Sequence, residues 1–177
     1  MKDKHDRWKS YLDKGSSAEK KKDYKKAISC YTRMIEVEPS DGWGYRIRAD
    51  VYVEKGDYGK AIADYTKAIR LNYHKDLARR YRADAYQKNG EYDKAIADYT
   101  WVIRNDPNDS SVYILYLFRA RAYVKKHDYI HALNDATKAQ KLGIKVDSKS
   151  LIKLRSKAEK QRQQQQSTVT GHNHTST

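Results

Sequence analysis

Four stretches of this sequence align with one another without gaps: DYKKAISCYTRMI (residues 23–35), DYGKAIADYTKAI (57–69), EYDKAIADYTWVI (91–103) and DYIHALNDATKAQ (128–140). They share an alanine, and the intervals between these alanines are 34, 34 and 37 residues (Ala27, Ala61, Ala95 and Ala132). The longer last interval indicates a three-residue insertion near Asn108–Val112. A constant period of this length is typical of proteins built from stacked repeats, each of them one supersecondary unit.

A second recurring stretch precedes each of the last three: IRADVYVEKG (47–56), YRADAYQKNG (81–90) and FRARAYVKKH (118–127). Repeat one has a degenerate version, DKGSSAEKKK (13–22). In both kinds of stretch, tyrosines and alanines recur at i, i+4 and i+7, which places them on one side of an α-helix. Each repeat is therefore predicted to form two amphipathic helices joined by a turn, at Gly56–Asp57, Gly90–Glu91 or His127–Asp128 in the last three.

This pattern of bulky, small, tyrosine and alanine positions resembles the tetratricopeptide repeat. Repeat two supplies Tyr45, Ala49, Tyr52, Ala61, Tyr65 and Ala68; repeat three supplies Ala83, Tyr86, Ala95, Tyr99 and Pro107. The resemblance covers residues 8–144, as repeats at about 8–41, 42–75, 76–109 and 110–144. It implies an all-α fold, a right-handed superhelical solenoid of antiparallel helix pairs.

The sequence after Gly143 predicts how the array ends. The segment 146–162 has a few apolar residues among many charges, as expected of a helix that covers the exposed edge of a terminal repeat. Residues 163–177 are polar and of low complexity, and we expect them to be disordered. The predicted organisation is thus a single domain over residues 1–162, with a capping helix at 146–162 and a disordered tail.

Comparison of the repeats with one another predicts ion pairs. Repeats two, three and four each have an arginine in the first helix and an aspartate in the second, whereas repeat one has Lys14 and Cys30 there. Joint presence and joint absence suggest that the two positions touch. We expect a structural salt bridge, bidentate where geometry permits, between the two helices of each repeat: Arg48 with Asp64, Arg82 with Asp98, and Arg119 with Asp135.

The resemblance also implies a binding site, because the first helices of tetratricopeptide repeats line a concave groove that binds peptides. The matching positions are Trp43, Arg46, Ile47, Asp50 and Val53, then Leu77, Arg80, Tyr81, Asp84 and Gln87, then Ile114, Leu117, Phe118, Arg121 and Val124. Their mixture of apolar anchors and arginines suits a peptide or helix with some acidic groups. The alternative is that several of them, above all Leu117 and Phe118, pack against the C-terminal helix or a neighbouring repeat.

One subfamily of these repeats grips the carboxylate tail of a chaperone with Lys, Asn and Arg at five positions. Counted from repeat one, those positions hold Leu12, Ser16, Ile47, Leu77 and Tyr81; counted from repeat two, they hold Arg46, Asp50, Tyr81, Ile114 and Phe118. Neither set forms the clamp, so the sequence disfavours a chaperone tail as the ligand.

The charge of the chain suggests other partners. Its 37 Lys and Arg against 23 Asp and Glu give a net charge of +14, and residues 110–177 contribute +9 of it. The charge gives one alternative to a peptide-binding adaptor, a basic nucleic-acid-associated protein that acts through its C-terminal half. A second alternative is a self-associating scaffold, held together through the tyrosine-rich repeats.

Several other classes are disfavoured. No catalytic constellation or Gly-rich phosphate loop is found, so we expect neither an enzyme nor a cofactor. His127 and His131 are four residues apart but begin at a turn, and we predict no metal site. No apolar run could span a membrane, and the charged N-terminus does not resemble a signal peptide, so a cytoplasmic protein is expected.

Overall fold

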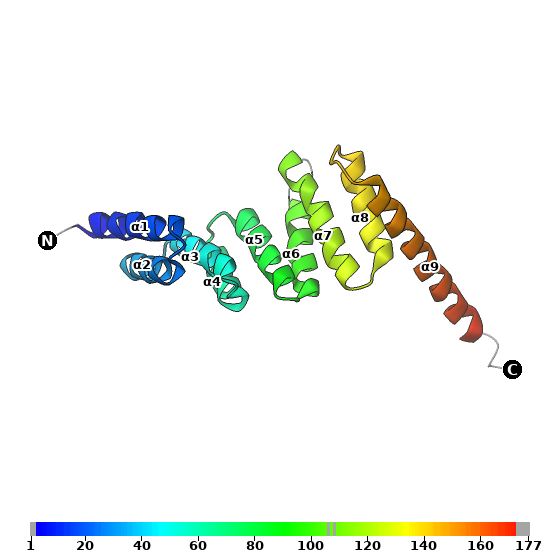
Figure 1. Ribbon diagram of the computed structural model, residues 1–177, viewed down its shortest axis with the longest axis horizontal. Helices are drawn as coiled ribbons and strands as arrows, with labels where there is room; N and C mark the ends of the chain where they lie inside the picture. Colours follow the sequence, from blue (N-terminus) through cyan, green and yellow to red (C-terminus); the bar gives the residue numbers. More distant parts are fainter. Residues whose placement is uncertain (1–2, 106, 108, 173–177) are drawn as a thin grey trace. The chain divides into compact units, whose positions relative to one another are not determined.

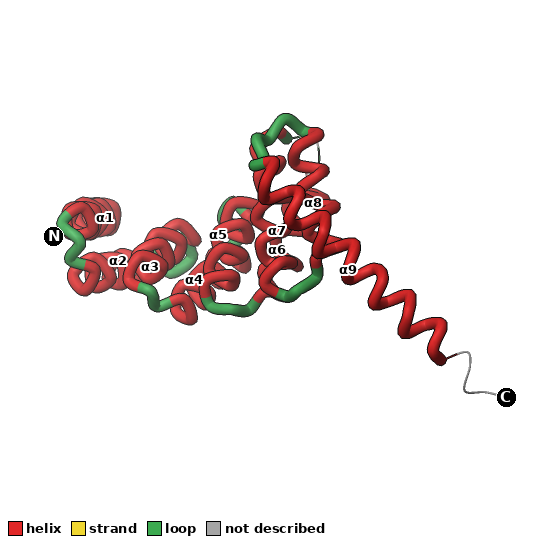
Figure 2. The backbone as a smooth tube through the Cα atoms, turned by 45° about the vertical axis from the view of Figure 1, so that its right-hand side comes forward, coloured by secondary structure: helices red, strands yellow, loops and turns green. Residues whose placement is uncertain are grey.

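The computed structural model describes residues 3–105, 107 and 109–172, and this part of the chain is all-α, without strands (Figures 1 and 2). The helix pairs that the repeat period predicts are present. They are α1 (Lys4–Lys20) and α2 (Tyr24–Val37), α3 (Gly42–Lys55) and α4 (Tyr58–Arg70), α5 (Lys75–Lys88) and α6 (Tyr92–Asn105), and α7 (Tyr113–Lys125) and α8 (Tyr129–Lys141), followed by α9 (Ser148–His172).

The chain divides into two compact parts, Met1–Asp98 and Tyr99–Thr177. The sequence predicts a single domain instead. A repeat contacts only its neighbours, so no common core holds such an array together, and the boundary between the parts falls within α6. We describe the N-terminal part and the C-terminal part separately.

The turn inside each repeat is set by one residue with left-handed backbone. Gly56 (φ 86°) and Gly90 (φ 81°) occupy this place in repeats two and three, where glycine adopts the conformation without strain. In repeats one and four the place is taken by Lys22 (φ 57°) and His127 (φ 60°). An acidic residue follows each of them and precedes the next helix. In repeat one it is Asp23, whose carboxylate accepts a hydrogen bond from the Lys26 backbone N–H at 3.1 Å.

Alanines lie at the centre of the core in each repeat, and in repeats one to three a tyrosine packs beside them. Ala27, Ala61, Ala95 and Ala132 have no exposed surface. Their small side chains let the two helix backbones approach, and the ring of Tyr31, Tyr65 or Tyr99 fills the space beside them, no more than 2% exposed. Repeat four has Ala136 in place of this tyrosine.

The three-residue insertion before repeat four forms a short 3₁₀ helix, η1 (Ser110–Val112). Asp109 precedes it and accepts a hydrogen bond from the Ser111 backbone N–H at 2.8 Å. Val112 is buried, so the inserted residues end on the core rather than in solvent.

Helix α9 packs on α8 through one side. Leu151 and Leu154 are half-buried and Ala158 is fully buried, at the spacing of a single helix face. On the same side, the Gln161 carbonyl Oε1 accepts hydrogen bonds from the backbone N–H groups of Tyr129 (2.8 Å) and Ile130 (3.2 Å). Because these N–H groups lie in the first turn of α8, the α9 side chain satisfies donors that have no partner within their own helix.

The sequence misplaces the ends of this helix. It begins at Ser148 and continues to His172, whereas the predicted limits are 146 and 162. Residues 163–172, expected to be disordered, are therefore helical. The reason is local, because the glutamine run favours helix and the first glycine or proline after Gly143 is Gly171. The remainder of the predicted tail, 173–177, lies outside the described residues.

The space around two helical glycines, Gly15 in α1 and Gly59 in α4, predicts opposite effects of an alanine substitution on stability. A Cβ at Gly15 would lie 2.3 Å from Cε1 of the buried Tyr31 ring, whereas a Cβ at Gly59 would meet nothing within 4 Å. We expect Gly15→Ala to lower the free energy of unfolding by up to about 2 kcal/mol, because overpacking outweighs the gain in helix propensity.

Gly59→Ala is the matched control, and we expect it to raise the free energy of unfolding by up to about 1 kcal/mol. Urea denaturation followed by circular dichroism measures both changes. Equal stabilisation by both alanines would contradict the close contact between Gly15 and Tyr31.

Candidate functional site

Three buried carboxylates join the helices of repeats two, three and four. Asp64, Asp98 and Asp135 are 8%, 4% and 6% exposed, and each faces the arginine predicted for it. Nε and Nη2 of Arg48 donate to the two oxygens of Asp64 at 2.7 and 2.8 Å. The same bidentate geometry, with distances of 2.7 to 2.8 Å, joins Arg82 to Asp98 and Arg119 to Asp135. The structure thus brings together all six residues of the predicted pairs.

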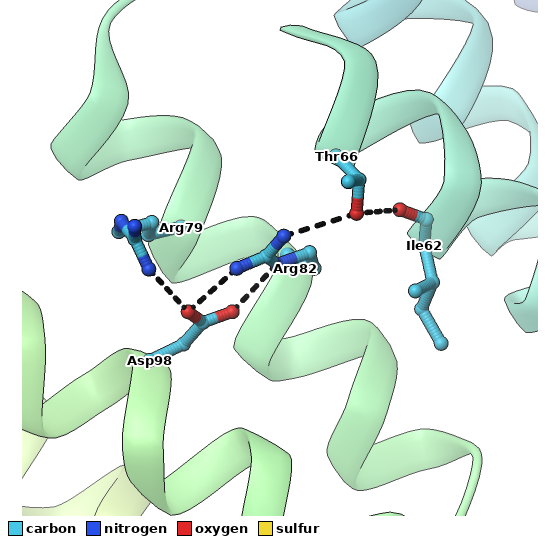
Figure 3. Close-up of polar contacts among 5 residues, drawn as sticks. All are labelled: Ile62, Thr66, Arg79, Arg82 and Asp98. Atoms are coloured by element: carbon cyan, nitrogen blue, oxygen red, sulfur yellow. Dashed lines mark hydrogen bonds and ion pairs between the residues drawn. The ribbon is translucent and has the colours of Figure 1, made fainter. Parts of the chain in front are cut away.

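A threonine of the preceding repeat completes each pair. Nη1 of Arg82 donates to the Thr66 hydroxyl at 3.0 Å, and that hydroxyl donates to the Ile62 carbonyl at 2.7 Å (Figure 3). Arg48 and Arg119 contact Thr32 and Thr100 in the same way, at 2.9 and 2.8 Å. Each arginine therefore connects three helices, one from the preceding repeat and two from its own. We call each set of arginine, aspartate and threonine a clamp.

The sequence contained a pattern that could have revealed these threonines. A threonine follows the shared alanine by five residues in every repeat, at Thr32, Thr66, Thr100 and Thr137. Comparison of arginine with aspartate alone does not find them, because threonine is present in repeat one as well. That presence has a structural reason, since Thr32 serves the arginine of repeat two.

The surroundings of each clamp favour the charged form of its arginine. Burial alone would lower the pKa of the Arg48 guanidinium, but the hydrogen bonds and the charge of Asp64 outweigh it and raise the pKa above its usual value. The pKa values of the Arg82 and Arg119 guanidinium groups are raised for the same reason. In the second clamp, Nη1 of Arg79 also donates to Asp98 at 2.9 Å (Figure 3).

In the N-terminal part, the predicted groove residues of α3 have divergent environments. Arg46 and Asp50 form an ion pair at 2.6 Å, and the Tyr65 hydroxyl donates to the other oxygen of Asp50 at 2.6 Å. Burial raises the pKa of Asp50 despite these contacts, and burial and Asp50 together raise the pKa of Tyr65. Ile47 is only 8% exposed and belongs to a core cluster with Tyr31 and Met34, so its assignment to the groove is wrong.

The predicted residues of α5 line a surface beside Tyr65. Leu77 is 37% exposed, which is unusual for a large apolar side chain in this protein. The Tyr81 ring stacks on the Tyr65 ring with centroids 6.0 Å apart and is half-buried. Arg80 and Asp84 are half-buried as well. Because Tyr65 contacts Asp50 on one side and Tyr81 on the other, it connects the faces of α3 and α5.

Trp43 contacts a residue that the sequence did not single out. Its ring lies 5.3 Å from the Trp8 ring of α1, and both pack partly against the core cluster of repeat one. Trp8 also lines an open cavity of about 370 Å³ with His5, Val37 and Glu38 among its other walls. We call the half-exposed side of α1, α3 and α5 the first-helix face: Trp8, Trp43, Arg46, Asp50, Leu77, Arg80, Tyr81 and Asp84.

In the C-terminal part, the α7 residues differ in their exposure. Phe118 is half-buried, with its ring 6.2 Å from that of Tyr99, so it contributes to packing. Arg121 is exposed and its guanidinium lies 5.6 Å from the Phe118 ring centroid. Leu117 is half-buried, and Val124 is 36% exposed.

Other candidate groups have local structural partners. His127 Nδ1 is 2.9 Å from the Tyr129 hydroxyl, and His131 Nδ1 is 2.8 Å from an Asp128 oxygen. Within the described residues no group of three or more His, Cys, Asp or Glu side chains could hold a metal ion. A search of the same residues finds no helix that is long and apolar enough to cross a membrane.

Comparison with known proteins identifies the repeat. A family model described as "Tetratricopeptide repeat" matches the chain three times, over residues 12–72, 48–110 and 82–139. No curated relative matches the chain by sequence.

Solved structures with the same repeat superpose on the chain. MamA 41-end from Desulfovibrio magneticus RS-1 is 18% identical, with a TM-score of 0.69 over 90% of this chain and 97% of that one. The second TPR domain of human RPAP3, in complex with the HSP70 peptide SGPTIEEVD, is 26% identical, with a TM-score of 0.59 over 68% and 98%. The N-terminal domain of STI-1 from C. elegans is 22% identical, with a TM-score of 0.57 over 65% and 98%.

The clamps predict a large cost for removing one partner. Asp64→Ala leaves the Arg48 charge half-buried and without its carboxylate, so we expect a loss of about 2–4 kcal/mol, between the costs of breaking exposed and fully buried pairs. Glu36→Ala, which breaks the exposed Arg33–Glu36 pair, should cost less than about 1 kcal/mol. Urea unfolding measures both.

The double variant Arg48→Leu, Asp64→Ala tests the reason for this cost. It removes the stranded charge, so it should be more stable than Asp64→Ala alone. If Asp64→Ala costs no more than Glu36→Ala, the clamp does not hold the helices together.

Proposed function

Because the chain belongs to the tetratricopeptide repeat family, we propose that it is a non-enzymatic adaptor that binds a peptide or helix of a partner protein on its first-helix face. The family match supports a protein-interaction module, and the human RPAP3 domain is a peptide-binding structure of the same fold. The binding surface within this chain is our proposal.

The observation that carries the proposal is the exposure of apolar surface beside a fixed polar network. Leu77 leaves more than a third of its surface in water, and the neighbouring Tyr81 ring is half-exposed. Next to them, Asp50 is held by Arg46 and Tyr65 in one geometry. Rigid aromatic and aliphatic anchors beside preorganised polar groups are typical of surfaces that bind with few energetically dominant residues.

The same geometry argues for an internal or apolar segment rather than a chaperone tail. RPAP3 binds a peptide that ends in EEVD. Here the positions that would grip a terminal carboxylate are apolar or occupied: Ile47 is buried in the core, Leu77 carries no charge, and Asp50 would repel a carboxylate. The sequence argument against this ligand therefore gains structural support at Ile47 and Asp50.

The first-helix face predicts which substitution weakens binding. Peptides selected from a random display library on the wild-type protein should bind Leu77→Glu at least tenfold more weakly, a loss of about 1.4 kcal/mol or more, because the charge replaces an apolar anchor. Fluorescence anisotropy of a labelled selected peptide measures the change.

Ile152→Glu is the matched control. Ile152 is an aliphatic side chain that is 67% exposed and lies on α9, so this variant should bind as the wild type does. The proposal would be contradicted if Leu77→Glu bound the peptide as tightly as the wild type does, or if no peptide were selected at all. Sedimentation of the unliganded protein at two concentrations distinguishes the remaining alternative of self-association through the same face.

A further inference from the structure

Helix α9 presents a basic face that its capping role does not use. Its packed side consists of Leu151, Leu154, Ala158 and Gln161. At 100° per residue, Lys149, Lys153 and Lys160 lie on the opposite side of the helix, and all three are exposed. Arg155 and Arg162, also exposed, lie on one flank between the two sides. We call these five cations the α9 basic face.

The charges of this face are not neutralised within the described residues. None of the ion pairs found there includes Lys149, Lys153, Arg155, Lys160 or Arg162. The contrast with the clamps is clear, since Arg48, Arg82 and Arg119 each hold a carboxylate. Glu159 is the single acidic residue of the helix. Lys157 differs from the five, because its ammonium group lies over the Tyr129 ring, 4.7 Å from the centroid.

The side chains around these cations indicate the chemistry of the ligand. Ser150 and Ser156 are exposed beside the lysines, and Gln163 follows them. Lys, Arg, Ser and Gln are the residues that contact phosphate and sugar groups of nucleic acids. The lysines alone extend over twelve residues, about 16 Å of helix, which is long enough to meet several phosphates.

Other anionic partners fit this surface less well. A membrane-surface helix needs an apolar side that enters the lipid. Here the leucines pack on α8, and between residues 148 and 167 only one apolar side chain, that of Ile152, is strongly exposed. A specific protein partner is usually held by buried aromatic anchors, and the exposed side of α9 between residues 148 and 167 has no aromatic residue.

We propose that the α9 basic face binds the phosphate backbone of nucleic acid without reading its sequence. Binding consists of ion pairs between the five cations and successive phosphates, with release of the counterions that those phosphates held. This activity is independent of the first-helix face, which lies in the N-terminal part of the chain.

The test is a salt titration with a fluorescein-labelled 20-base-pair DNA duplex and a 20-nucleotide RNA of the same sequence. Five phosphate contacts predict a slope of log K against log salt of about −4.5 on the duplex and about −3.5 on the single strand. The triple variant Lys149→Gln, Lys153→Gln, Lys160→Gln should reduce the duplex slope by about 2.7 and weaken binding at 50 mM salt.

A second triple variant controls for net charge. Lys21, Lys25 and Lys26 are exposed lysines of repeat one that form no ion pair among the described residues, so their change to glutamine removes the same charge elsewhere. This control, and Leu77→Glu, should keep the wild-type slope. All substitutions are at exposed positions, and circular dichroism verifies that each variant is folded.

Three results would overturn the proposal. The first is no measurable binding of either probe at 50 mM salt. The second is an equal loss in the two triple variants, which would show that bulk charge rather than α9 determines binding. The third is an unchanged affinity for both probes in the α9 variant together with lost sedimentation on phosphatidylserine vesicles, which would assign the face to a membrane surface.

Discussion

The bidentate salt bridge between a buried aspartate and an arginine is the constraint on which the packing of the helices within and between neighbouring repeats depends. A carboxylate that is only 4 to 8% exposed is unfavourable unless an opposite charge and hydrogen bonds satisfy it. The arginine does both, and its third nitrogen reaches the threonine of the repeat before. The planar guanidinium allows one orientation of the three helices around it, so the contact specifies geometry as well as adding stability.

This constraint explains how each helix keeps one rotation about its axis although the core is rich in small residues. Alanines let helices approach closely but hardly distinguish one rotation from another. The clamps fix the rotation of α3, α5 and α7. On α3 and α5, the side that remains carries residues of the proposed binding surface. In repeat one, where the clamp is absent, α1 is held instead by Gly15 against Tyr31 and by Trp8 against Trp43. Tyr31 is also tied to α1 through its bond to Glu19 at 2.7 Å.

The cationic side chains of the protein include two groups with different roles. Arginines of the clamps are engaged with carboxylates and serve the fold. The five cations of the α9 basic face have no such partners among the described residues, and their helix is attached to α8 by leucines, an alanine and a glutamine on its other side. Each clamp pair sums to zero charge, so the net charge of +14 comes from cations outside the clamps, the α9 basic face among them.

The sequence by itself determined the repeat, its all-α class and the arginine–aspartate pairs, because each of these is recorded at a fixed spacing that recurs in the chain. Only the tertiary structure decided that a threonine completes each pair, that Ile47 belongs to the core and that Trp8 contacts Trp43. It also decided that α9 continues to His172 and that Gln161 caps α8. The physical reason is that burial and hydrogen bonding depend on what a neighbouring helix places opposite a residue. The repeat period fixes which helix face a residue occupies, but the partner opposite that face is set by the packing of neighbouring helices against one another.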